Sequence, residues 1–223
     1  MNPSIQVYGR ESIRMSPDGF SFYKPDGGKL ICRTFPNNSS DLLTIQAPLF
    51  FPLGETVTVV AAQHIPMLVP EELYDPAKDR EYLALQYDIS QLGATYSDQV
   101  GAYRAVYFLT RNEADTLGQF SYPKQTVSEA TLLYRFLCSQ GPQPALIAAL
   151  NDGFTDIVAV QKEEVLLMNR FRPAEPEDTL YHILNVIRQQ NMRQPAIYLQ
   201  FLAEENRKLP QLLKTCNLNP VIL

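Results

Sequence analysis

Three short apolar segments near the start of the chain alternate with groups of turn-forming residues. The first two segments, residues 12–15 and 20–23, are separated by a Pro-Asp-Gly turn at residues 17–19. Proline presets its own φ and glycine accepts a positive φ, so this spacing favours a tight turn between two strands. A second turn at residues 24–28 leads into a third apolar segment at residues 29–35. The pattern predicts a three-stranded antiparallel meander.

The same pattern recurs in the second half of the chain. Strands are expected at residues 145–150, 154–160 and 165–171, with turns at residues 151–153 and 161–164. Asp18-Gly19-Phe20-Ser21 aligns with Asp152-Gly153-Phe154-Thr155 at an offset of 134 residues (152 − 18), and Leu30 and Phe35 align with Leu166 and Phe171 at an offset of 136 (166 − 30). Turn chemistry, strand order and the closing aromatic residue all agree. We therefore expect an internal duplication.

The second copy continues with clear helix and strand signals. Pro176 suits a helix start, and the neighbouring acids Glu175, Glu177 and Asp178 complement the positive end of the helix macrodipole. An apolar stripe at helical spacing extends this helix to about residue 190. Three further elements are expected: a buried strand at residues 196–202, a helix at residues 209–216 and a terminal strand at residues 219–223. The predicted order is β-β-β-α-β-α-β.

The rest of the first half is less regular. Ser40 and Asp41 are expected to cap a short helix that Pro48 would end. Strands are expected at residues 56–62, 67–69 and 103–109, with a weaker one at residues 82–85. Helical segments are expected at residues 70–74, at residues 112–120 and from a start at residues 126–129. Gly141-Pro142 is the clearest break before the second meander.

A β-β-β-α-β-α-β unit that occurs twice resembles the actin-like ATPase architecture, which is a doubled ribonuclease-H-like fold. The strings SIRMSPDGFSF at residues 12–22 and MLVPEELY at residues 67–74 are similar to an uncharacterised Bacteroidetes domain-of-unknown-function family with that fold. The resemblance covers most of the chain and is weakest at residues 36–55. It implies an α/β protein of two actin-like subdomains, residues 1–125 and 126–223, each a meander followed by alternating helices and strands. Pilus- and division-type actin-like proteins are similar in structure, and some of them act as scaffolds.

Composition and charge narrow the class of partner. The net charge of −5 and the mixed distribution of charges argue against nucleic-acid binding, which needs a positive surface. No apolar run approaches the ~20 residues that cross a bilayer, and the first residues lack the apolar run of a signal peptide. Cys32, Cys138 and Cys216 are expected to be buried apolar residues in a reducing compartment. We therefore expect a cytoplasmic protein without membrane insertion.

The resemblance implies a nucleotide in a cleft between the two halves, with an Asp-x-Gly turn from each half facing it. Such turns must direct backbone N–H groups at phosphate oxygens, and an acid must hold hydrated magnesium. Here Asn151 replaces the acid and Phe154 stands where a small residue is needed. Asp18 and Asp152 could face a metal, but tight-turn residues are the favoured interpretation. The candidate cleft residues are Asp18, Gly19, Asn151, Asp152, Gly153 and Thr155.

Other chemistry has weaker signals. His64 and His182 have no further ligand or nucleophile at motif spacing, although Asp178 lies one helical turn before His182 and could pair with it. The sequence also lacks Walker-type, Gly-x-Gly-x-x-Gly, Gly-x-Ser-x-Gly and Cys-x-x-Cys motifs. We therefore assign no catalytic residue and no metal ligand, and we expect no cofactor.

Two functional hypotheses follow from the sequence. The favoured one is a non-catalytic protein-interaction or scaffold protein on a degenerate actin-like fold, a pseudoenzyme whose partner is another protein. The alternative is a nucleotide-binding ATPase or kinase-like enzyme that uses the cleft between the subdomains. A small-molecule sensor that uses the same cleft is a third possibility, and the fold alone does not separate the three.

Overall fold

The computed structural model describes residues 7–8, 11–17, 19–26, 29–36, 45, 47–51, 54–202 and 208–223. The chain divides into two compact units, Met1–Leu132 and Leu133–Leu223, which we call the first and second units. The division falls within helix α5 (Glu129–Ser139). The domain boundary expected from the sequence, between residues 125 and 126, stays a prediction.

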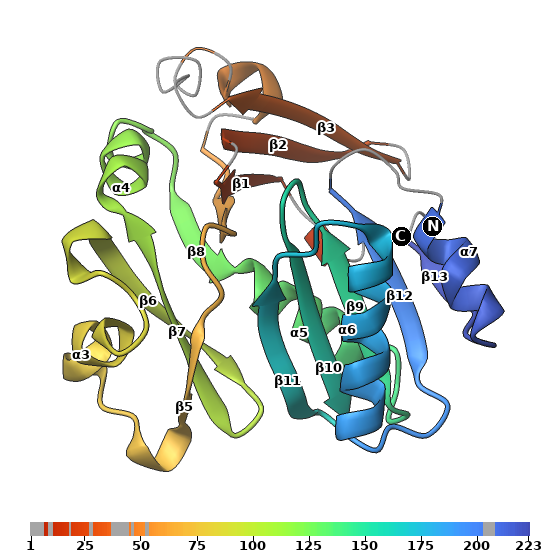
Figure 1. Cartoon of the computed structure of the whole chain (residues 1–223). Coiled ribbons are helices and arrows are strands. Elements are labelled where there is room, and N and C mark those ends of the chain that lie inside the picture. The colour runs from red at the N-terminus through yellow and green to blue at the C-terminus, as the bar shows by residue number, and fades with distance from the viewer. Residues whose placement is uncertain are drawn as a thin grey trace. The chain divides into compact units, whose positions relative to one another are not determined.

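The first unit contains a five-stranded sheet with the order β3-β2-β1-β4-β8 (Figure 1). Its strands are β1 (Ser12–Ser16), β2 (Gly19–Asp26), β3 (Lys29–Pro36), β4 (Val57–Ala61) and β8 (Lys124–Ser128). Strand β2 is antiparallel to both β1 and β3, β4 is parallel to β1, and β8 is parallel to β4. The predicted first meander is confirmed.

The second unit repeats this arrangement in full. Its sheet has the order β11-β10-β9-β12-β13, with the same antiparallel and parallel pairings. Its strands and helices are β9 (Ala145–Leu150), β10 (Thr155–Gln161), β11 (Glu164–Phe171), α6 (Pro176–Gln189), β12 (Ala196–Phe201), α7 (Lys208–Thr215) and β13 (Pro220–Ile222). Helix α6 lies across one face of the sheet (Figure 1). The predicted order β-β-β-α-β-α-β is therefore confirmed.

An additional three-stranded antiparallel sheet belongs to the first unit. Its order is β5 (Met67–Pro70), β7 (Tyr103–Thr110), β6 (Leu92–Val100). The accompanying helices are α3 (Asp79–Ala84) and α4 (Arg111–Gly118), and short 3₁₀ helices span Glu71–Leu73, Pro76–Lys78 and Ile89–Gln91. Leu83 of α3 packs on this sheet in a small core with Val106 and Phe108.

The register of the two hairpins refines the duplication. Ile13 pairs with Phe22 and Met15 with Phe20, while Ala148 pairs with Ile157 and Leu150 with Thr155. These inward-facing pairs differ by 135 residues (148 − 13 and 155 − 20), so Phe20 is equivalent in register to Thr155 and not to Phe154. The first hairpin closes after two residues and the second after four, residues 151–154. Asp18 lies outside the described residues, so its equivalence with Asp152 stays a prediction.

One secondary-structure prediction in the first unit is wrong, and one predicted helix is confirmed with a later start. Residues 82–85 do not form a strand, because Asp79–Ala84 forms α3, where Leu83 is the one buried side chain and a single helical face therefore contacts the core. The helix expected to start at residues 126–129 starts at Glu129. Residues 124–128 are instead strand β8, because their β-branched Thr126 and Val127 pair with the buried strand β4.

Strand β6 was not expected because it contains polar and small residues. A Cβ at Gly93 would lie 2.7 Å from the carbonyl oxygens of Leu109 and Thr110. Glycine is therefore needed where the register of β6 and β7 shifts, between Leu92 and Thr95. Pairing with the buried strand β7 stabilises β6 despite its weak strand propensity.

Two prolines occupy positions in helices or strands that the sequence analysis did not expect. Pro48 does not end a helix, because residues 47–50 on both sides of it are helical. The expected caps Ser40 and Asp41 lie outside the described residues. Pro25 is part of β2, and it is tolerated because β1 pairs with β2 only as far as Tyr23.

The three cysteines are not core residues. Cys32 and Cys216 are exposed and Cys138 is partly buried, and all three are free thiols. The reason is their position: Cys32 lies on the edge strand β3, and Cys216 follows the last residue of α7. Apolar sequence neighbours therefore did not imply burial.

Candidate functional site

Four of the sequence-predicted site residues line one cavity in the second unit. This cavity, which we call the second-hairpin cavity, has a volume of about 480 Å³. The β9–β10 hairpin contributes Asn151, Asp152, Gly153 and Thr155. The remaining lining residues are Leu150, Pro173, Ala174, Glu175, Pro176, Thr179, Phe201 and Leu209.

The hairpin turn is closed by its own hydrogen bonds. The Asn151 N–H donates to the Phe154 carbonyl at 2.9 Å, and the Asn151 side-chain amide donates to the Ala149 carbonyl at 3.3 Å. Gly153 has a φ of +73°, the left-handed conformation that favours glycine. The expected strand residue Phe154 belongs to this turn, because β10 starts at Thr155. The backbone and the side-chain amide of Asn151 therefore both hold the hairpin turn.

Phe154 covers a partly buried ion pair next to the turn. The Arg170 guanidinium contacts Asp156 in a bidentate pair, with Nε–Oδ1 and Nη2–Oδ2 distances of 2.7 Å. The Phe154 ring is 3.8 Å from the Arg170 guanidinium carbon, and Phe154 and Asp156 are 6% and 1% exposed. Asp156 therefore neutralises the charge of Arg170.

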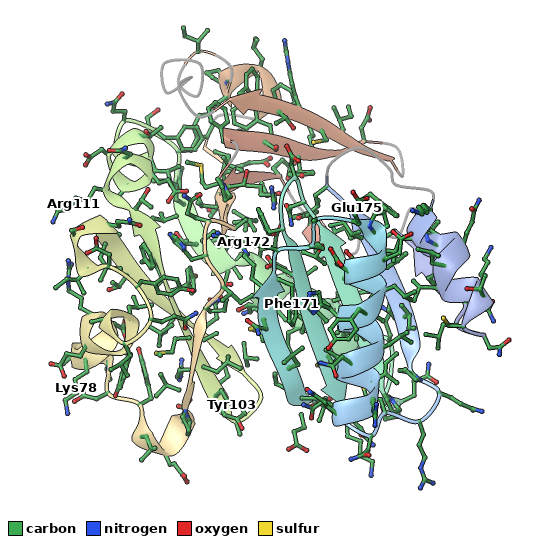
Figure 2. The ribbon with its side chains drawn as sticks, in the orientation of Figure 1. Lys78, Tyr103, Arg111, Phe171, Arg172 and Glu175 are labelled. Carbon is green, nitrogen blue, oxygen red and sulfur yellow. The ribbon has the colours of Figure 1, made fainter. Side chains whose placement is uncertain are left out.

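The start of α6 forms another side of the cavity (Figure 2, where Glu175 is labelled). The N–H groups of Ala174 and Glu175 donate to the Asp178 carboxylate at 3.0 and 3.1 Å. Pro176 has no N–H, and the N–H groups of Asp178 and Thr179 donate to the Glu175 carbonyl at 3.0 and 3.4 Å. These bonds use the donors that would otherwise make a helix N-terminus an anion site.

The cavity has an acidic lining. Asp152 and Glu175 contribute carboxylates, and the described lining residues include neither lysine nor arginine. Lys208, at the start of α7, forms an ion pair with Glu177 at 2.6 Å.

The pair of Asp178 with His182 that the sequence suggested does not form. The Asp178 carboxylate instead accepts hydrogen bonds from N–H groups at the start of the helix. His182 instead stacks on Phe171, with 4.3 Å between ring centroids.

Gly19 lines a different cavity, in the first unit. This cavity has a volume of about 490 Å³ and lies between the β1–β2 hairpin and the start of α4. The Glu113 carboxylate accepts hydrogen bonds from the Thr110 N–H and hydroxyl at 2.8 and 2.9 Å. Burial raises the pKa of Glu113, although the bonds from Thr110 oppose the shift. One arginine, Arg111, balances this acid, so the lining carries no clear charge preference.

The first unit also contains a buried polar cluster that sequence analysis missed. The Arg14 guanidinium donates from Nε and Nη2 to the two carboxylate oxygens of Glu129, the second at 2.9 Å. The Tyr8 hydroxyl donates to the same carboxylate, and Tyr8 stacks on Tyr23 at 4.4 Å. Arg14 and Glu129 are 4% and 1% exposed. Burial alone would lower the pKa of Arg14, but the Glu129 carboxylate together with the nearby tyrosine hydroxyls raises that pKa overall.

The candidate residues thus fall into two separate groups. Asn151, Asp152, Gly153 and Thr155 lie together at one cavity, Gly19 lies at another, and Asp18 lies outside the described residues. Whether the two turns face one cleft stays a prediction. Sequence reasoning did not assign Glu175 or Thr179 to the site, although the acids around Pro176 were the available signal. Within the described ranges, no group of three His, Cys, Asp or Glu side chains could hold a metal ion.

Solved structures show the fold of the chain. A Bacteroides thetaiotaomicron protein with an actin-like ATPase fold and unknown function aligns with a TM-score of 0.74 and 18% identity, over 100% of this chain and 93% of that one. A chain of the PilM-PilN type IV pilus biogenesis complex aligns with a TM-score of 0.59 and 12% identity, over 96% and 88%. The ethanolamine utilization protein EutJ from Carboxydothermus hydrogenoformans aligns with a TM-score of 0.50 and 8% identity, over 96% and 84%.

The fold is therefore actin-like, as the sequence predicted. No curated protein matches the chain significantly by sequence. In the part of the chain that the structure describes, no helix is both long and apolar enough to cross a membrane. The model of the family DUF3822, proteins of unknown function, matches residues 53–216. The chain belongs to this family.

Proposed function

We propose that this chain is a non-catalytic protein-binding module on an actin-like fold. The observation that carries the proposal is the hydrogen bonding of the second-hairpin cavity. The N–H groups of Ala174, Glu175, Asp178 and Thr179 are bonded to the Asp178 carboxylate or to the Glu175 carbonyl, and among the described residues the lining has carboxylates and no basic side chain. Phosphate recognition needs converging N–H donors or cations, so this cavity is poorly suited to a nucleotide.

The alternative is a nucleotide-binding ATPase or kinase-like enzyme. One observation favours it: the hairpin residues Asn151 to Thr155 do line a cavity of ligand size. Asp152 would then be the acid available for hydrated magnesium. Phosphoryl transfer also depends on electrostatic stabilisation of the transferred group, however, and the lining residues that the structure describes supply no cation for it.

The likeness to a chain of the PilM-PilN complex supports a protein partner, because that protein is part of an assembly. The net charge of −5 favours a neutral or basic partner protein and disfavours nucleic acid. The proposal places the complex in the cytoplasm and includes no cofactor and no catalytic residue.

The first prediction is that Mg-ATP does not bind. Adding millimolar Mg-ATP to the full chain should leave the melting temperature unchanged and give no heat of binding in titration calorimetry. The test is sensitive, because a ligand at 100 times its Kd adds about 2.7 kcal/mol to the free energy of unfolding. A rise in melting temperature that Asp152→Ala abolishes would establish the nucleotide-binding alternative. A rise that persists in Asp152→Ala would place a nucleotide elsewhere and would also contradict the proposal.

A further inference from the structure

We infer that the second-hairpin cavity binds the ammonium or guanidinium group of a lysine or arginine side chain presented by the partner protein. The inference rests on the proposed function and adds the chemistry by which the partner is recognised. Three features of the cavity support it: its charge, its hydrogen-bonding groups and its apolar walls.

The charge of the cavity favours a cation. Asp152 and Glu175 line it, and both are exposed and open to a ligand. The positive end of the α6 macrodipole, equivalent to roughly half an elementary charge, opposes a cation. Three carboxylates within the first turn and its cap, those of Glu175, Glu177 and Asp178, outweigh it, although Lys208 pairs with Glu177 and also attracts Glu175.

The hydrogen-bonding groups of the cavity favour a donor. Thr155 and Thr179 line it and are 2% and 3% exposed, and neither hydroxyl forms a hydrogen bond within the described residues. Neither oxygen is among the fully buried polar atoms that lack a partner in the described part of the chain, so both are accessible from the cavity and can accept hydrogen bonds from a ligand there. Ammonium and guanidinium groups carry donors only, and carboxylate and hydroxyl oxygens accept from them.

The walls suit the aliphatic part of a basic side chain. Leu150, Phe201 and Leu209 contribute apolar surface, and Pro173 and Pro176 form part of the rim without adding N–H donors. Lysine and arginine pack their methylene stems on such surface while the charged end reaches polar groups. A volume of about 480 Å³ accommodates one basic side chain and part of the backbone that carries it.

The inference is tested with capped single amino acids, because the partner is unidentified. N-acetyl-arginine methylamide, the matching lysine compound and the matching glutamate compound are titrated into ¹⁵N-labelled full chain. The two basic compounds should shift the amide signals of Asp152, Gly153, Ala174 and Thr179, and the glutamate compound should not. Glu175→Gln and Asp152→Asn should each weaken arginine binding by about two- to fivefold, the range measured for exposed ion pairs.

Glu177→Gln is the matched control. It removes the same charge from the same helical turn, but Glu177 pairs with Lys208 and is not a lining residue. It should leave arginine binding within the error of the measurement. Equal weakening by Glu177→Gln and Glu175→Gln would show that only net charge matters, and it would overturn the site.

Two further results would overturn the inference. If neither basic compound shifts the amide signals, the inference is overturned. The protein-binding proposal then stands, provided that Mg-ATP also fails to bind. Binding of agmatine, a free guanidinium compound, at least about tenfold tighter than the capped arginine would assign the cavity to a small amine and not to a partner side chain. Comparable affinities for the two would support a side chain, because the cavity would then accept the attached backbone.

Discussion

Replacing Glu129 by glutamine is expected to lower the free energy of unfolding by about 3–5 kcal/mol, because it removes the charge that compensates buried Arg14. Arg14 and Glu129 are almost fully buried, and their contact is bidentate. Arg14 stays protonated and charged even when buried, because the pKa of arginine is far above neutrality. The Tyr8 hydroxyl would also lose a charged acceptor.

The matched control is a second Arg–Glu pair in the same unit. Arg104 donates to both carboxylate oxygens of Glu71 at 2.8 and 3.2 Å, but the two side chains are 33% and 47% exposed. Glu71→Gln should therefore change stability far less than Glu129→Gln. Urea unfolding of the full chain, followed by tyrosine fluorescence, measures both variants. Equal shifts in the two midpoints would contradict the proposed cost of an uncompensated buried charge.

A hydrophobic replacement separates pairing from packing. Arg14→Met combined with Glu129→Leu removes both charges while keeping apolar volume, so the double variant should recover most of the stability that Glu129→Gln loses. Tyr8→Phe can be added to avoid an unpaired hydroxyl. If the double variant is as unstable as the single one, the cluster stabilises the fold through its specific geometry and not through charge compensation.

The second unit could be predicted from sequence because its signals are local. Turn residues separate its strands, and Pro176 with its neighbouring acids marks the start of α6. Each of these features acts within a few residues, so the chain need not be folded to interpret it. The same holds for the first meander, whose turn chemistry resembles that of the second.

The first unit was less predictable because pairing between distant segments decides its structure. Strand β8 forms through its contact with β4, more than 60 residues earlier (124 − 57 = 67). Strand β6 contains a glycine that only the approach of β7 explains. The short apolar run in α3 fits either a helix or a strand. Only the folded structure, in which Leu83 is its one buried side chain, identifies this segment as a helix.

The candidate site was predicted in part for the same reason. The hairpin residues Asn151 to Thr155 are contiguous, so turn chemistry placed them together. Glu175 and Thr179 reach the same cavity only because α6 packs on the sheet. Buried Arg14 and partly buried Arg170 were missed because polar residues inside strands are normally taken to face solvent, whereas each of these arginines has a carboxylate partner from another element.

The duplication makes the second ion pair open to an internal comparison. Ser21 pairs with Thr34 in the first sheet, and Asp156 pairs with Arg170 at the equivalent position of the second. Each pair lies one residue from the pair that contains the closing aromatic residue, Phe35 or Phe171. In the first sheet the hydroxyl oxygens of Ser21 and Thr34 are 2.9 Å apart. Equivalent cross-strand positions in the two sheets therefore hold a neutral pair in one and an ionic pair in the other.

Asp156→Ser is therefore expected to lower the free energy of unfolding by about 2–3 kcal/mol, because the partly buried Arg170 would lose its bidentate carboxylate beneath Phe154. Adding Arg170→Thr recreates the serine–threonine pair of the first sheet and should restore most of the loss. The difference between the single and double variants in urea unfolding measures the cost of the unpaired charge. A double variant no more stable than Asp156→Ser would show that the second sheet depends on the ionic pair itself. Recovery would instead show that the two copies share a backbone that tolerates both pairs.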